Sequence, residues 1–228
     1  MQNVLTAARQ RFLRDHPCVT ALDVSYGSSA TLAAQVVSGS PADVFVSASD
    51  ATMATVVNAG LARSGPVVFA RNNGALMVSP RSQYRGTISG IPDLLDSANS
   101  GIKVGLCVVS APCGSLADRI MKAAGSSLGR TDLTRARIAD TETGSVEDLV
   151  SKIEMGELDA GIVYASDCVY AIRLGLAACV PFPADINQSN NYLAAGLNSR
   201  RNSADFVKVM TSSWFAALLT NEYGFLAP

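Results

Sequence analysis

Residues 20–46 read TALDVSYGSSATLAAQVVSGSPADVFV, and this stretch carries the pattern that decides the fold. Apolar side chains alternate with polar ones at about 20–26, which predicts a strand. The small residues at 27–29 then predict a turn, and the apolar positions after them recur at the spacing of a helix. Residues 42–46 are mostly apolar and predict a second, buried strand. One strand–turn–helix–strand unit is therefore expected here.

The same succession of strand, turn and helix recurs twice further along the chain. A strand at 103–108 precedes the turn at 112–115, and a strand near 136–139 precedes the turn at 143–145. In both places, apolar residues at helical spacing follow the turn directly. Alternation of strands and helices along a chain is typical of α/β proteins, so α/β is the predicted fold class.

Other elements surround these units. A helix is expected at 3–14, and Asp50 is the expected N-cap of another helix. Two strands are expected near 66–70 and 74–79. The helix–strand alternation then begins again, which indicates a second block of the same kind.

The two blocks predict two lobes. A helical region at about 202–221 is expected to return to the first block. Residues 1–75 and 196–228 are therefore predicted to form lobe one, and residues 76–195 to form lobe two. A cleft between two such lobes is a common ligand site.

Composition excludes several classes of protein. The chain has 228 residues, of which 48% are hydrophobic and 16% are charged, so global disorder is excluded. The formal net charge is −1 and no polybasic tract is present, so no nucleic-acid partner is expected. No apolar run reaches the roughly 18–20 residues that span a bilayer. The chain also lacks the pattern of a signal segment.

The three turns share a chemistry that suits an anion. Glycine allows backbone N–H groups to approach a ligand closely, and serine adds a neutral hydroxyl donor. The N-terminus of a helix carries about half a positive charge. None of the three turns has a Lys or Arg beside it. The pattern favours a fully ionised oxyanion, although serine and glycine at helix starts also serve as ordinary caps.

The chain has five cysteines, which are Cys18, Cys107, Cys113, Cys168 and Cys179. Their spacing fits no zinc pattern and the single histidine is remote, so no metal-cation site is expected. Cys107 and Cys113 are either a short disulfide or two buried thiols. Cys168 and Cys179 form a second candidate pair, which leaves Cys18 as the expected free thiol. A catalytic cysteine would need a base beside it, and no catalytic residue is expected.

Several motifs resemble the molybdate-binding proteins of ABC importers, in an actinobacterial-like variant with extra cysteines. The motifs follow the family's order and cover nearly the whole chain. They are YGSSATLAAQ (26–35), GSPADVFVSA (39–48), APCGS (111–115), GSVED (144–148), GIVYASD (161–167) and EYGF (222–225).

This resemblance implies a two-lobed periplasmic-binding-protein fold of class II, with one oxyanion in the cleft between the lobes. In the family, two serines, two backbone N–H groups and one tyrosine hydroxyl bind the anion. Carried over by motif, the second serine is Ser29, and the neighbouring Ser28 supports the turn. The backbone donors fall at Cys113 and Val146, and the hydroxyl belongs to Tyr164.

The resemblance also implies a function without catalysis. The ligand is molybdate or tungstate, no cofactor is needed, and molybdenum is bound only as its oxyanion. A monomer outside the cytoplasm, periplasmic or anchored to the cell surface, is expected to deliver the anion to a membrane permease. The alternatives are a binding protein for sulfate or phosphate, or an enzyme or sensor domain on the same bilobal fold. An enzyme would need an acid–base pair or an activated nucleophile, which the matched residues do not supply.

One departure from the family lies at the start of the chain. The family begins with a short strand and a binding serine that opens the first helix. Counting back from Phe12 places that serine just before Met1. We therefore expect that the chain is truncated at its amino end relative to the family, without the first strand, that serine or any signal segment.

Overall fold

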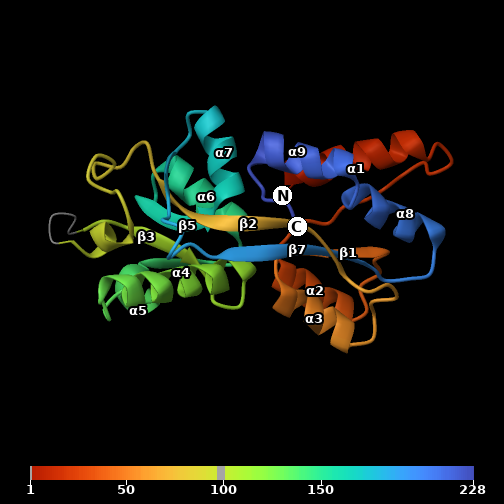
Figure 1. The fold of residues 1–228 in the computed structure, drawn as a ribbon, viewed down its shortest axis with the longest axis horizontal. Coiled ribbons are helices and arrows are strands. Elements are labelled where there is room, and N and C mark those ends of the chain that lie inside the picture. The colour runs from red at the N-terminus through yellow and green to blue at the C-terminus, as the bar shows by residue number, and fades with distance from the viewer. Residues whose placement is uncertain (1, 97–100) are drawn as a thin grey trace. The chain divides into compact units, whose positions relative to one another are not determined.

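The computed structural model describes residues 2–96 and 101–228. Internal contacts divide the chain into two compact units (Figure 1). Unit 1 comprises Met1–Arg71 and Asn190–Pro228, and unit 2 comprises Asn72–Ser189. Both dividing points lie inside strands, namely β2 (Val67–Val78) and β7 (Ser189–Gly196). They come a few residues before the points expected from the sequence.

The sheet of unit 1 is built on β7. β1 (Val44–Ser47) runs antiparallel to β7, with Val44 opposite Gly196 and Ser47 opposite Leu193. On its other side, β7 lies beside β2. Successive side chains of a strand point to opposite faces, so each face of this sheet needs its own cover.

Helices cover both faces of the unit 1 sheet (Figure 1). Their bounds are α1 (Gln2–Asp15), α2 (Ser29–Val37), α3 (Asp50–Asn58), α8 (Arg201–Met210) and α9 (Ser213–Tyr223). On one face, Phe12, Phe69 and Phe215 belong to a core that α1, α8 and α9 share. On the other face, Phe45 and Met53 belong to a second core beneath α2 and α3.

Unit 2 has a mixed sheet with parallel strands at one side. β5 (Ala160–Tyr164) runs parallel to β3 (Val104–Cys107), which in turn runs parallel to β4 (Thr141–Thr143). β2 lies antiparallel to β5 and also to β6 (Ala178–Pro181). All residues of β3 and β5 are buried, which is typical of parallel strands with both faces covered.

The helices of unit 2 follow its strands closely. Their bounds are η1 (Ile91–Leu95), α4 (Pro112–Leu128), α5 (Arg135–Ile138), α6 (Val146–Met155) and α7 (Ala165–Arg173). α4, α6 and α7 each begin within a few residues of the end of a parallel strand. Within the described ranges, none of the helices combines the length and the hydropathy needed to span a bilayer.

Two predicted strands are wrong. Residues 20–26 form no strand, although Leu22 and Val24 pack against the core of unit 1. The alternation shows which side chains face inward, but the main chain there pairs with no described strand, and Arg9 Nε donates to the carbonyl of Leu22 at 2.6 Å. Residues 136–139 instead belong largely to α5, because Ile138 N–H donates to Thr134 O at 3.1 Å and closes a local turn.

Other element boundaries also differ from the prediction. The two strands expected near 66–70 and 74–79 are one strand, β2. Asp50 is the first residue of α3, and Ser49 is its N-cap, because the Ser49 hydroxyl accepts from Thr52 N–H at 3.2 Å. The helical region at 202–221 is divided into α8 and α9, and the hydroxyl of Ser212 caps the second of these.

Two disulfides settle the pairing that the sequence left open. Cys107 at the end of β3 is bonded to Cys113 in the first turn of α4. Cys168 in α7 is bonded to Cys179 in β6. Both bridges lie within unit 2, and Cys18 in unit 1 is a free, exposed thiol.

Candidate functional site

The turn before α2 holds an unusual hydroxyl. Ser28 is the N-cap of α2, but its side chain makes no capping hydrogen bond. Across residues 2–96 and 101–228, Ser28 Oγ is the one buried side-chain nitrogen or oxygen without a hydrogen-bond partner. A buried polar group without a partner costs about 1–3 kcal/mol, so such a group in a folded protein needs an explanation. An acceptor that is not part of the chain would supply one.

The adjacent serine is used differently. Ser29 Oγ accepts a hydrogen bond from the Ala48 N–H at 3.0 Å, which ties the start of α2 to the segment between β1 and α3. A hydroxyl that accepts one bond can still donate its own proton. Ser29 Oγ thus has a partner in the chain, and Ser28 Oγ has none among the described residues. That Ser29 binds the anion and Ser28 supports the turn stays a prediction.

Ala48 is a residue that the sequence reading missed. It lies just after β1 and just before α3, so it shares the strand–turn–helix design of the other turns. The signal was present in the PADVFVSA run, where small residues follow an apolar strand. Through its bond to Ser29, the structure brings the Ala48 amide to the same place as the two serines.

The turn between β3 and α4 contains the first expected backbone donor of unit 2. Pro112 is the first residue of α4 and Cys113 the second, so the N–H of Cys113 belongs to the first turn, where helix geometry leaves amides without intrahelical partners. A Cβ at Gly114 would lie 2.0 Å from the Val108 carbonyl oxygen, so only glycine fits this close approach.

The turn between β4 and α6 contains the second expected backbone donor of unit 2. Ser145 is the N-cap of α6, and its hydroxyl accepts from the Asp148 N–H at 3.2 Å. Ser145 is therefore an ordinary cap here. Val146 is the first residue of the helix, and its amide also lies in the turn that lacks intrahelical partners.

Tyr164 ends β5 and is the N-cap of α7. Its residue is 4% exposed, so the ring is packed into unit 2. Its backbone N–H donates to Asp167 Oδ2 at 3.2 Å. Burial, together with repulsion from Glu147, raises the pKa of the Asp167 carboxyl to about 6.

The parallel strands bring the unit 2 residues to one edge of the sheet. β4, β3 and β5 run in the same direction, so their carboxyl ends, and the starts of α6, α4 and α7, lie along the same edge. Val108 N–H donates to Thr143 O at 2.8 Å and joins the first two turns. Ligands of open α/β sheets commonly bind outside the carboxyl ends of the strands.

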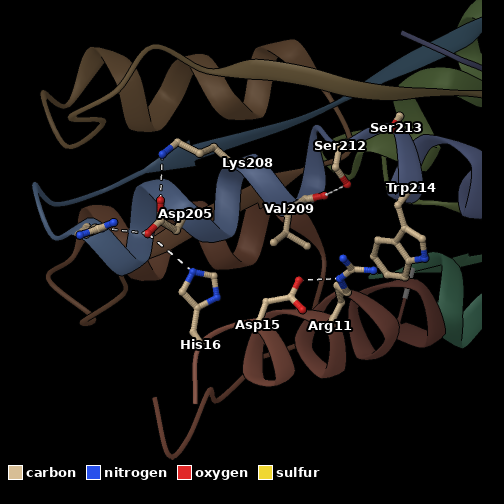
Figure 2. A pocket seen from close by; sticks show the side chains of 10 residues that line it. Arg11, Asp15, His16, Asp205, Lys208, Val209, Ser212, Ser213 and Trp214 are labelled. Carbon is tan, nitrogen blue, oxygen red and sulfur yellow. Dashed lines mark hydrogen bonds and ion pairs between the residues drawn. The ribbon is translucent and has the colours of Figure 1, made fainter. Parts of the chain in front are cut away.

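A separate pocket in unit 1 has a different chemistry. Figure 2 shows it between α1, α8 and the start of α9. Its volume is about 530 Å³. Arg11 pairs with Asp15 at 2.6 Å, and Asp205 is shared between Lys208 at 2.9 Å and Arg201 at 3.5 Å, so the cations of the pocket outnumber its carboxylates. The Lys208 hydrogen bond holds the pKa of Asp205 below its usual range. None of the predicted donors lines this pocket.

A metal-cation site would need several ligating side chains close together. In the part of the chain that the structure describes, no three His, Cys, Asp or Glu side chains gather as a site for a metal ion. The predicted donors are hydroxyl and amide N–H groups, which can donate hydrogen bonds to an anion.

Comparison with known proteins places these features in context. A family model described as bacterial extracellular solute-binding protein matches residues 1–226. The molybdate-binding protein ModA of Mycobacterium tuberculosis is 31% identical over an alignment of 231 residues that covers 100% of this chain and 82% of the relative. The ModA protein of Escherichia coli is 27% identical over 206 residues, covering 88% of this chain and 76% of the relative.

Solved structures share the fold. The periplasmic molybdate-binding protein of Azotobacter vinelandii superposes with a TM-score of 0.75 and 22% identity, covering 100% of this chain and 95% of the other. The sulfate-binding protein SubI of Mycobacterium tuberculosis superposes with a TM-score of 0.81 and 18% identity, covering 97% and 82%. At these identities the likeness concerns the fold, which confirms the predicted two-lobed periplasmic-binding-protein class.

Proposed function

Because the chain belongs to the family of bacterial extracellular solute-binding proteins, we propose that it captures a tetrahedral oxyanion, molybdate or tungstate, for delivery to the membrane permease of an ABC importer. The family binds solutes and does not catalyse reactions, as the sequence predicts. The curated relatives that match over the full chain are named for molybdate binding, which supports the choice of ligand.

The buried Ser28 hydroxyl, which has no partner in the part of the chain that the structure describes, is the observation that carries this proposal. An oxyanion oxygen is the acceptor that such a hydroxyl needs, and a bond to a charged acceptor is worth about 1.5–3 kcal/mol. We propose that Ser28, Ser29 and Tyr164 supply hydroxyl donors, and that Cys113 and Val146 supply backbone N–H donors. Helix N-termini favour negative charge without any basic side chain.

A donor-only set of ligands favours a fully ionised anion. Molybdate, tungstate and sulfate carry no proton near neutral pH, whereas phosphate retains one and would require an acceptor in the site. The site is expected to need no cofactor, since the anion is the cargo. The size of the anion, and not its charge, then separates molybdate and tungstate from the smaller sulfate.

Titration calorimetry of the purified chain with molybdate, tungstate, sulfate and phosphate tests this function. Molybdate and tungstate are nearly equal in size, so they should bind with similar dissociation constants, and sulfate and phosphate should bind more weakly. Sulfate that binds as tightly as molybdate would assign the protein to another anion.

The setting of the protein follows from the same proposal. Two disulfides favour an oxidising compartment, which suits a protein that acts outside the cytoplasm. We propose that the protein is a monomer in solution and engages the permease as such. Light scattering behind a sizing column, with and without molybdate, gives the mass that checks this.

A further inference from the structure

Arg135 in α5 occupies an unusual position beside the β3–α4 turn. Its Nη1 donates to the Cys107 carbonyl at 2.7 Å, and its Nη2 donates to the Gly114 carbonyl at 3.1 Å. The same guanidinium contacts the carboxylates of Asp118 at 2.9 Å and Glu142 at 2.6 Å. One side chain therefore holds both ends of the turn, a residue of α4 and a residue of β4.

The β3–α4 turn that Arg135 contacts is also closed by a disulfide. The disulfide joins Cys107, whose carbonyl Arg135 contacts, to Cys113, which precedes the other contacted residue, Gly114. Gly114 packs directly on the Val108 carbonyl, where no Cβ fits. The turn is thus held at fixed geometry by a disulfide, a close backbone contact and a forked guanidinium.

Arg135 also connects this turn to the next one along the sheet edge. Glu142 precedes Thr143, whose carbonyl accepts from Val108 N–H at 2.8 Å. β4 then leads through Ser145 to Val146. The guanidinium consequently links the β3–α4 turn to β4, the strand that leads into α6.

The charge of Arg135 is compensated within the cluster. Two carboxylates contact one guanidinium, so no surplus positive charge is left to attract an anion. Its side chain is 21% exposed, less than that of either carboxylate partner. The planar fork of arginine suits simultaneous bonds to several acceptors, and lysine offers only a point charge.

We propose that Arg135 is a positioning residue that sets the spacing between the Cys113 and Val146 amides and so makes the protein select its oxyanion by size. This inference rests on the proposed oxyanion-binding function. Rigid donors at a fixed spacing fit one anion radius, and donors whose support is lost adapt to a smaller anion. Loss of Arg135 should therefore reduce discrimination and not simply weaken binding.

The test measures the ratio of the dissociation constants for sulfate and molybdate by titration calorimetry on the full chain. Arg135→Met removes the fork, and Arg135→Lys keeps the charge but reaches fewer carbonyls. Arg137→Met is the matched control, because Arg137 is an exposed arginine in the same short helix. Circular dichroism confirms that each variant is folded.

We expect Arg135→Met to weaken molybdate binding by about tenfold or more, by analogy with outer-shell partners of metal sites, whose loss costs about 10–100-fold in affinity. Sulfate binding should change much less, so the sulfate-to-molybdate ratio falls. Arg135→Lys should give an intermediate ratio, and Arg137→Met should match the wild type. If Arg135→Met does not fold, the sulfate-to-molybdate ratio of dissociation constants for Arg135→Lys is compared with that of the wild type instead.

An unchanged ratio in the folded Arg135 variants overturns the inference, even if both affinities fall, since an equal loss for both anions means a general effect of charge or stability. A wild-type chain that binds neither anion overturns the proposed function and this inference with it. The two failures are thus distinguished by the wild-type titration.

Discussion

Ser28 and Ser29 are neighbours with the same side chain, yet their hydroxyls have opposite surroundings. Ser29 Oγ accepts from the Ala48 N–H, whereas Ser28 Oγ is buried without a partner among the described residues. Removing a group that makes a hydrogen bond destabilises a protein, but removing an unsatisfied buried group relieves its desolvation cost. Stability and binding should therefore respond differently at the two positions.

Ser28→Ala should affect stability and binding in opposite directions. The unliganded variant should be as stable as the wild type or up to about 1–3 kcal/mol more stable, because a buried orphan hydroxyl is lost. Molybdate binding should weaken by about 1.5–3 kcal/mol, because one donor to a charged acceptor is lost. Urea denaturation without ligand and titration calorimetry with molybdate give the two values.

Ser212→Ala is the matched control. The Ser212 hydroxyl caps α9 by accepting from Phe215 N–H at 3.2 Å, so its loss should cost about 1 kcal/mol of stability and leave binding unchanged. A Ser28→Ala variant that behaves like Ser212→Ala would mean that the Ser28 hydroxyl is structural and contacts no ligand.

The sequence predicts the turn, but not which of the two serine hydroxyls has a hydrogen-bond partner in the chain. Small residues directly before a run of apolar residues at helical spacing are a local signal, and all three such turns do open helices. Which hydroxyl is satisfied depends on Ala48, nineteen residues beyond Ser29 in the sequence. The sequence alone does not show that contact, because it exists only when β1 and α2 pack together.

The carboxyl of Asp167 in α7 ionises less readily in the folded protein than in the unfolded chain. Burial raises the pKa of Asp167 from 3.8 to about 6, and repulsion from Glu147 adds to the shift. Between these two values the folded chain binds more protons than the unfolded chain. The free energy of unfolding therefore falls as pH rises from about 4 to about 6, and the contribution of protonated Asp167 is lost above that range.

Asp167→Asn should remove this pH dependence. An amide oxygen can still accept from Tyr164 N–H but carries no charge. The variant should match the wild type near pH 4 and be more stable near pH 8, by at most about 3 kcal/mol for a pKa raised from 3.8 to about 6. Urea denaturation at both pH values measures the difference, and a variant that is less stable near pH 8 would contradict this account of Asp167.

The same contrast between local and distant signals explains which elements were predictable. The helix predicted at 3–14 is α1, and the turn at 112–115 does open α4, because caps and apolar spacing act within a few residues. Strands depend on a partner, and residues 20–26 alternate like a strand yet pair with none in the described chain. Residues 136–139 are apolar enough for a strand but are wound into α5 by local bonds.

The covalent cross-links are unevenly distributed between the two units. Both disulfides lie in unit 2, and unit 1 contains only the free thiol of Cys18. The Cys168–Cys179 bridge closes a loop with a sequence separation of 11, for which chain entropy gives about 2–3 kcal/mol of stabilisation. β2 and β7 each have residues in both units. The stabilisation by this disulfide could therefore either stay within unit 2 or also reach unit 1 through these strands.

We expect it to be confined to unit 2, because each unit has its own buried core. The double substitution Cys168→Ala with Cys179→Ala should lower protection of unit 2 amides in hydrogen exchange by about 2–3 kcal/mol and leave unit 1 amides unchanged. Cys18→Ala should alter neither unit. Equal loss of protection in unit 1 would show instead that β2 and β7 couple the two cores, so that the chain unfolds as a single cooperative structure.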